Sequence, residues 1–321
     1  MLGKGAMIWK IREWAGGDPA AQVGDAQALG LNWVALKVVD GTLERWERNL
    51  PKQNADLLPA LVPRLAEAGI TVIAWGWTYG RIRNLPFTSI AALEAQLTAE
   101  IVARYAGLGL KKVYLIDAEH DYKESYRRPG QVVGLNMAGE ATKYMTTLRA
   151  ADPDLRLYLC AYRYPSVHGD FPWAAFLADA HGHAPQVYFL EDVRSEGGEL
   201  QLARSLQELT ALKPLPALPI GPTYRHVRRD GKEWQATGEQ LTRFFAKAKA
   251  LDCEGVGVWT LEQATEEQRL ALQAFQWEEA QPEPRVRWED LDAAAKDALL
   301  FRMAQKVGLV DQDGFVLEEP V

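Results

Sequence analysis

The stretch KKVYLIDAEHDY at residues 111–122 carries three acids at its end, Asp117, Glu119 and Asp121. The apolar run before them predicts a buried strand. Alternate side chains of a strand point to opposite faces, so Asp117 and Glu119 share one face. Two unpartnered carboxylates in an apolar core would cost several kcal/mol, so we expect the pair at the open end of the strand, in a polar cleft. Carboxyl groups held side by side in a cleft can perform acid–base catalysis.

The elements that position these acids are predicted by short apolar runs that alternate with amphipathic segments. We expect the acidic strand within residues 111–122 and seven others at 6–11, 33–39, 70–78, 155–161, 186–190, 217–222 and 255–260. Helices lie between them, and two begin with capping-box spacing, Thr237 with Gln240 and Thr265 with Gln268. Eight such repeats indicate a closed TIM barrel, which we favour over an open doubly wound sheet because no glycine-rich phosphate loop follows the first strand.

Beyond the barrel, the chain is predicted to continue as a small appendage. We place the barrel at residues 1–280, a linker with the sequence QPEPRVR at 281–287, and a helix with a short tail at 288–321. Leu291, Ala295, Leu299 and Met303 form one apolar stripe on that helix. The stripe fits either a helix folded back on the barrel or a docking element for a protein partner or a larger particle.

Composition excludes several classes of function. The 321 residues carry a formal net charge of -7, which argues against a nucleic-acid partner. No apolar run is long enough for a membrane span, and the first residues, MLGKGAMIWKIREW, contain no signal peptide. We therefore expect a protein that is cytoplasmic at synthesis, with a phage-encoded or particle-associated origin left open. The five histidines and two cysteines show no metal-binding spacing, His181 and His183 are expected in a loop, and we expect no metal or cofactor.

The active site of a TIM barrel lies where the strands end, and acids and aromatic residues gather at these positions. Aromatic faces stack on sugar rings, and carboxylates bind hydroxyl groups and transfer protons at a glycosidic oxygen, so a polysaccharide is the expected ligand. Lys37, in the middle of the second strand, is expected to turn inward as a charge partner of the acids. The candidates for substrate binding are Trp9, Asp40, Trp75, Trp77, Tyr79, Asp121, Tyr162, Tyr188, Glu191, Tyr224, Trp259 and Glu262.

Three strand ends resemble those of a known family. LKVVDG at the second strand, LIDAEHD at the fourth and GVGVWTLEQA at the last resemble family 25 glycoside hydrolases, the lysozyme-like muramidases common among bacteriophage lysins. The Asp-x-Glu of residues 117–119 is also similar to the family 18 chitinase pattern. The resemblance implies a TIM barrel in which Glu119 is the general acid. It also implies that Asp117 orients and charge-stabilises a substrate N-acetyl group, or a water.

The chain departs from family 25 at the end of the first strand, where MIWKIREW replaces a Gly-x-Asp-x-Ser pattern. Glu13, Asp40 and Glu262 are the acids that could replace the missing aspartate. Our leading hypothesis is a glycosidase acting on an N-acetylhexosamine polymer such as peptidoglycan. The alternative is a non-catalytic carbohydrate-binding or structural barrel of a phage or other particle. An enzyme for phosphorylated or carbonyl substrates ranks last, because no phosphate-binding glycine loop follows the seventh strand.

Overall fold

A computed structural model describes residues 2–41, 56–82, 85–123, 134–189, 197–227, 231 and 233–277, with the backbone alone for 85–87. The chain divides into two compact units, Met1–Trp277 and Glu278–Val321, and every described residue belongs to the first. The predicted linker at 281–287 and the helix at 288–321 lie outside the described residues. Glu191 also lies outside them.

Eight strands form one parallel sheet in the order β8, β7, β6, β3, β2, β1, β12, β9. The two outer strands also meet, because Leu218 N donates to His183 O (2.7 Å) and Ile220 N donates to Pro185 O (2.9 Å). The sheet is therefore closed, which confirms the predicted TIM barrel. The strands are β1 (Gly3–Ile8), β2 (Trp33–Asp40), β3 (Thr71–Thr78), β6 (Leu110–Ala118), β7 (Arg156–Cys160), β8 (Gly182–His183), β9 (Ile220–Pro222) and β12 (Gly255–Trp259).

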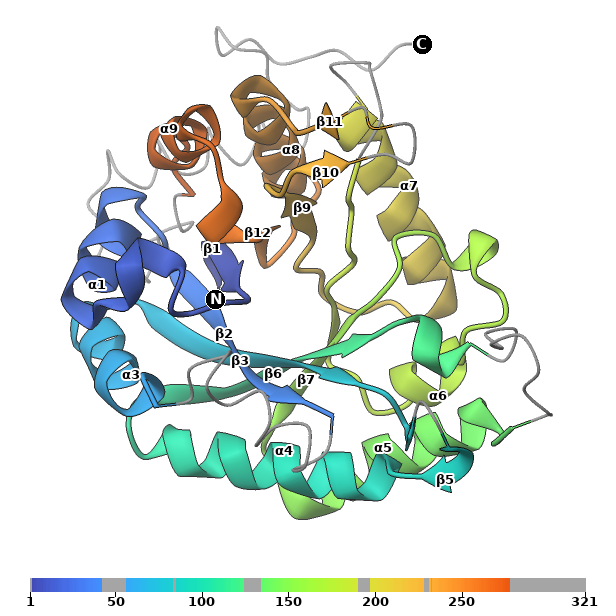
Figure 1. The fold of residues 1–321 in the computed structure, drawn as a ribbon. Coiled ribbons are helices and arrows are strands. Elements are labelled where there is room, and N and C mark those ends of the chain that lie inside the picture. Colours follow the sequence, from blue (N-terminus) through green and yellow to red (C-terminus); the bar gives the residue numbers. More distant parts are fainter. Residues whose placement is uncertain are drawn as a thin grey trace, which may run out of the picture. The chain divides into compact units, whose positions relative to one another are not determined.

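Helices lie around the outside of these strands (Figure 1). The two predicted capping boxes are present, with Thr237 and Thr265 each bonded to the backbone of the glutamine three residues later. Two short hairpins that were not predicted follow β3 and β9, namely β4 (Arg81–Ile82) with β5 (Leu85–Ser89) and β10 (His226–Val227) with β11 (Glu233–Trp234). The helices are α1 (Pro19–Ala28), α3 (Leu58–Glu67), α4 (Ala91–Ala106), α5 (Met137–Ala151), α6 (Trp173–Leu177), α7 (Gly197–Leu212), α8 (Gly238–Ala250) and α9 (Glu266–Ala274).

The side chains of the strands divide into two apolar clusters, one inside the barrel and one between strands and helices. On β6, Leu115 belongs to the inner cluster, whereas Tyr114 and Ile116 belong to the outer one. The predicted alternation along this strand is therefore confirmed. Trp33 fills part of the interior, and its ring would lie 2.1 Å from a Cβ atom at Gly5, so this close approach requires glycine there.

The sixth strand differs from its prediction at 186–190. The regular strand is β8, Gly182–His183, and isolated parallel bridges from Gln186 to Tyr162 and to Ile220 continue it. Pro185 interrupts the ladder between them because proline has no backbone N–H. His183 is therefore part of a strand, which corrects the prediction of a loop there.

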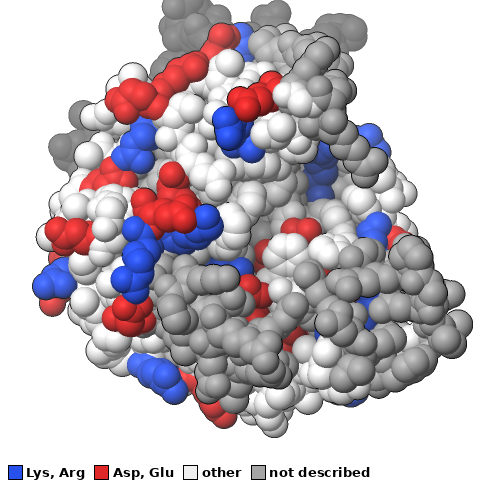
Figure 2. Space-filling view, viewed as in Figure 1, with Lys and Arg blue, Asp and Glu red and all other residues white. Residues whose placement is uncertain are grey.

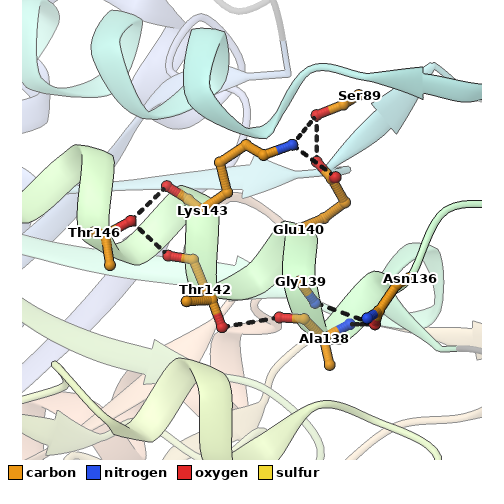
Figure 3. Close-up of polar contacts among 8 residues, drawn as sticks. All are labelled: Ser89, Asn136, Ala138, Gly139, Glu140, Thr142, Lys143 and Thr146. Atoms are coloured by element: carbon orange, nitrogen blue, oxygen red, sulfur yellow. Dashed lines mark hydrogen bonds and ion pairs between the residues drawn. The ribbon is translucent and has the colours of Figure 1, made fainter.

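Helix α5 begins later than predicted, at Met137 instead of residue 131. Asn136 ends the preceding loop, because its side-chain oxygen accepts hydrogen bonds from Ala138 N (3.1 Å) and Gly139 N (3.2 Å). One turn along this helix, Glu140 and Lys143 bind each other and Ser89, the last residue of β5 (Figure 3). This cluster fixes the β4–β5 hairpin, which follows β3, to the outer helix.

Candidate active site

Asp117 and Glu119 lie at the end of β6 and share one neighbour, the amide of Gln186. Gln186 Nε2 donates to Asp117 Oδ1 at 2.9 Å and to Glu119 Oε1 at 2.8 Å. Asp117 is buried and Glu119 is half-buried, so Glu119 is the more accessible of the two. Figure 2 shows acidic atoms gathered in a hollow near the centre of the view. The predicted pair therefore exists as two carboxyl groups joined by one amide.

Burial is the main influence on the ionisation of this pair. It raises the pKa of Asp117 well above its usual value, Glu119 raises that pKa further, and Lys37 lowers it. Burial also raises the pKa of Glu119, against the hydrogen bond from Gln186 and the nearby His120, which lower it. The charge of each carboxyl group disfavours ionisation of the other, so the two groups titrate as a unit. A carboxyl group that stays protonated near neutral pH can act as a general acid.

Lys37 lies inside the barrel, as predicted. Its Nζ atom is 3.1 Å from Asp40 Oδ2 and 5.1 Å from the centre of the Trp75 ring. Tyr79 donates its hydroxyl hydrogen to the other oxygen of Asp40 at 2.7 Å. Asp40 therefore binds a buried cation and a tyrosine, and it lies on β2, two strands away from Asp117.

Four half-buried aromatic side chains form a wall at the ends of β1, β8, β9 and β12, which we call the aromatic wall: Trp9, Tyr188, Tyr224 and Trp259. Trp259 is its centre, with ring centroids 6.1 Å from Trp9, 5.8 Å from Tyr188 and 4.9 Å from Tyr224. The Trp259–Thr260 peptide bond is cis. Adjacent half-buried rings at a barrel mouth offer a surface on which a sugar can stack.

Trp77 and Tyr162 are two further aromatic residues near the acid pair. Trp77 pairs with Asp117 across the β3–β6 ladder, and it packs against Tyr79 and the edge of His120. Tyr162 stacks on His168 with ring centroids 3.9 Å apart, and Lys123 Nζ lies 5.0 Å from its ring centre. Both side chains are half-buried, so both predicted residues are accessible beside the pair.

Three other candidates are placed differently from the prediction. Trp75 is 2% exposed inside the barrel, and its indole N–H donates to Ile8 O at 3.0 Å. Asp121 is 1% exposed. Glu262 accepts hydrogen bonds from Trp9 N (3.1 Å) and Lys10 N (2.8 Å), and Thr260 binds its other oxygen. Trp75 and Asp121 are thus buried, and the half-buried Glu262 fastens the end of β1.

Glu94, on α4, was not predicted to act near the site. It is 1% exposed, and its carboxyl group accepts hydrogen bonds from Thr78 Oγ1 (2.7 Å), Tyr79 N (3.0 Å) and Gly80 N (2.8 Å). Burial raises the pKa of Glu94 to about 7, and these hydrogen bonds only partly oppose the rise. The residue fixes the turn after β3, and with it the ring of Tyr79.

Glu94 makes the stability of the protein dependent on pH. Its pKa is raised from 4.5 to about 7, so the folded state holds a proton that the unfolded chain has already lost. The resulting stability is complete below about pH 4.5 and is lost as the pH rises through 7. The contribution of Glu94 to the free energy of unfolding is at most about 3 kcal/mol. Urea unfolding at several pH values between 5 and 8 measures the slope of the unfolding free energy against pH. We expect a flatter slope in Glu94→Gln, and an identical slope in both proteins would contradict this assignment.

Gln186 and Glu94 are thus site residues that sequence reasoning missed. Gln186 was assigned only to a predicted strand, although a polar residue at an inward position of an apolar strand, directly after Pro185, was a usable signal. Glu94 gave no signal, because a glutamate on an amphipathic helix is normally exposed.

Within the described ranges, no group of three or more His, Cys, Asp or Glu side chains could hold a metal ion. No described helix is long and apolar enough to cross a membrane.

Comparisons with known proteins show a likeness of fold. No protein-family model and no curated protein matches this sequence. A chitinase from Rhizomucor miehei is 13% identical, with a TM-score of 0.57 over 84% of this chain and 98% of that one. A β-glucanase from Saccharophagus degradans is 12% identical, with a TM-score of 0.59 over 85% and 87%. A chitinase from Chromobacterium violaceum is 12% identical, with a TM-score of 0.53 over 86% and 100%.

At these identities the likeness shows the shared barrel and nothing finer. None of the three structures is a muramidase, so the resemblance to family 25 stays a prediction.

Proposed function

We propose that this barrel is a glycoside hydrolase that cleaves an N-acetylhexosamine polymer, with peptidoglycan and chitin as the substrates to compare. The observation that carries the proposal is the Asp117–Glu119 pair, in which one amide binds both carboxyl groups at the end of β6. The aromatic wall supplies a stacking surface for sugar rings at the same end of the barrel. Chitinases and a β-glucanase share the fold, which supports the same reaction class.

We propose a different role for each carboxyl group. Glu119 is the more accessible, so it donates its proton to the glycosidic oxygen as the C–O bond breaks and the leaving sugar departs as an alcohol. Asp117 is deeper, and it stabilises the positive charge that develops at the anomeric carbon or positions the acetamido group. Water then supplies the hydroxyl group of the new reducing end and returns a proton to Glu119.

Trp259 is expected to contribute binding more than chemistry, because it lies at the centre of the aromatic wall. Trp259→Ala should raise KM by roughly 10-fold, from the loss of one stacking surface. Trp259→Phe keeps a ring there and should recover most of the affinity. Initial rates across a range of oligomer concentrations measure KM and kcat. An unchanged KM in Trp259→Ala would show that the sugar lies elsewhere.

The substrate is tested by incubating the protein with purified peptidoglycan and with N-acetylglucosamine oligomers. New reducing ends are counted, and the products are identified by mass spectrometry. Products with an N-acetylhexosamine at the new reducing end support the proposal. The substrate that is cleaved faster identifies the preferred polymer. No release from either polymer would contradict it.

A second candidate is a barrel that binds sugar without cleaving it. Two of the three acids that could replace the family 25 aspartate are engaged elsewhere, because Glu262 binds backbone N–H groups and the exposed Glu13 pairs with Lys10 at 2.8 Å. Only Asp40 remains, and it pairs with Lys37. Retained binding to one polymer, without any release of reducing ends, would favour this candidate. A phage or particle origin, and a partner for residues 288–321, remain proposals that accompany it.

A further inference from the structure

An arginine is attached directly to the aromatic wall. Arg163, just beyond β7, donates a hydrogen bond from Nη1 to the backbone carbonyl of Tyr188, one of the four wall residues. The ring of Tyr188 packs against those of Tyr224 and Trp259. A positive charge therefore lies within one residue of the surface on which we propose that sugar rings stack.

The ring of Tyr164 gives the same side chain a second contact. The Arg163 guanidinium lies 5.1 Å from the centre of this ring, and that of Arg204, on α7, lies 4.1 Å from it. Arg163 is half-buried, so its guanidinium is held by a ring and a carbonyl group at the rim of the barrel. A guanidinium is a planar fork of N–H donors that matches the two oxygens of a carboxylate, and one that is already held loses less freedom on binding.

The charge of Arg163 acts on both the wall and the residues beside the acid pair. Burial raises the pKa of Tyr224, a wall residue, and Arg163 opposes that rise. Burial lowers the pKa of His168, which stacks on Tyr162, and nearby cations that include Arg163 lower it further. Tyr162 forms a parallel bridge with Gln186, the residue that binds both carboxyl groups of the pair. Together with the contact to the wall, these effects place Arg163 where the wall meets the acid pair.

A cation at this place matters most for a sugar that carries a negative charge. Acidic atoms gather in the hollow of the mouth (Figure 2), and the whole chain has a formal net charge of -7. A carboxylate on the substrate would be repelled by these acids, and a fixed guanidinium beside the wall offsets the repulsion. A neutral sugar gains no such advantage from the arginine.

We propose that the glycan carries carboxylate groups and that Arg163 binds one of them while the sugar rings stack on the aromatic wall. The inference rests on the proposed function and narrows its substrate, because an acidic N-acetylhexosamine polymer is then preferred over neutral chitin. The carboxylate can belong to a uronic acid that alternates with the N-acetylhexosamine. It can also belong to a lactyl ether on the hexosamine, as in peptide-free peptidoglycan strands. Both present the same group to Arg163.

Two other cations adjoin the wall, and both belong to exposed ion pairs. Lys10 Nζ lies 4.8 Å from the centre of the Trp9 ring and 2.8 Å from Glu13. Arg225 comes directly after a wall residue in the sequence and pairs with Glu233 at 3.1 Å. Water and salt screen such exposed pairs, so we expect them to add little to the choice of substrate. Arg225→Gln is therefore the matched control, because it removes an arginine from the same rim.

Binding is measured in the Glu119→Gln background, so that no oligomer is cleaved. The probes are peptide-free peptidoglycan oligomers, oligomers that alternate glucuronic acid with N-acetylglucosamine, and both after reduction of their carboxyl groups to alcohols. Calorimetry should show one acidic oligomer binding about 10-fold more tightly than its reduced form, the usual effect of a charge-assisted hydrogen bond. Arg163→Gln should abolish this preference, Arg163→Lys should keep part of it, and Arg225→Gln should keep all of it.

The outcomes separate the two claims. Equal binding of acidic and reduced oligomers with Arg163 in place, or a preference that persists in Arg163→Gln, would overturn the inference while the proposed function stands. An equal loss of affinity for both forms in Arg163→Gln would also overturn it, because it would show that Arg163 only supports the wall. If the wild type cleaves no glycan, the proposed function fails, and the binding preference still tests Arg163. The acidic oligomer that binds more tightly identifies the source of the carboxylate.

Discussion

Glu119→Gln is expected to lower kcat for N-acetylglucosamine oligomers by about 10²- to 10⁴-fold, the usual contribution of a positioned general acid. The amide has nearly the same shape, and its oxygen can still accept the hydrogen bond from Gln186, so the fold and the affinity for substrate should be preserved. What is lost is the proton that the leaving sugar requires. Reducing-end release at several oligomer concentrations measures the effect.

The leaving group provides an internal control for this variant. An aryl glycoside with an acidic phenol departs without protonation, so Glu119→Gln should cleave it far better than it cleaves the natural oligomer. Glu262→Gln is the matched substitution at a glutamate that binds backbone N–H groups, and it should affect both substrates equally. If Glu119→Gln lost activity equally on both substrates, Glu119 would not be the acid.

Gln186→Leu is expected to lower kcat by about 10- to 100-fold, because one substitution removes the hydrogen-bond donor of both carboxyl groups. Hydrogen bonds to charged groups are worth about 1.5–3 kcal/mol each, and leucine keeps a similar volume without a donor. The bond from Gln186 lowers the pKa of Glu119, so its loss should move the basic limb of the pH–rate profile to higher pH. The profile of kcat against pH measures both changes.

Gln22→Leu is the matched control for that substitution. Gln22 is a buried glutamine whose amide binds Ile11 O at 2.6 Å and Trp14 O at 3.0 Å, outside the strand ends that carry the acid pair. Its replacement should lower stability and leave the pH profile in place. A normal profile in Gln186→Leu, or a shifted one in Gln22→Leu, would show that the amide does not tune the pair.

The parts that the sequence predicted well depend on local patterns. Alternation along residues 111–119 was enough to separate Leu115 from Tyr114, because a strand has a fixed period of two. The structure places Leu115 in the inner cluster and Tyr114 in the outer one. Repetition of strands and helices predicted the barrel, and the barrel placed Trp9 and Trp259 together among the strand-end residues. The structure then brings their ring centroids to 6.1 Å of each other.

The parts that were missed depend on contacts between distant segments. Glu262 looked like a loop acid at the mouth, and only its bonds to Trp9 N and Lys10 N show that it fastens the first strand to the last. Glu94 is fixed by a turn on another element. The role of Gln186 was not predicted, because Pro185 interrupts the strand that carries it. Tertiary packing selects the partners of Glu262 and Glu94, and no sequence spacing indicates them. For Gln186, its inward position in an apolar strand was the one available signal.

A crystal structure of Glu119→Gln with a bound N-acetylglucosamine oligomer tests the central claim most directly, namely that Asp117 and Glu119 act together on a glycosidic bond. The account predicts sugar rings against the aromatic wall, with one glycosidic oxygen within about 3 Å of the side chain at position 119 and the adjacent anomeric carbon or acetamido group next to Asp117. An oligomer bound away from the pair, or one with no glycosidic oxygen near position 119, would contradict it.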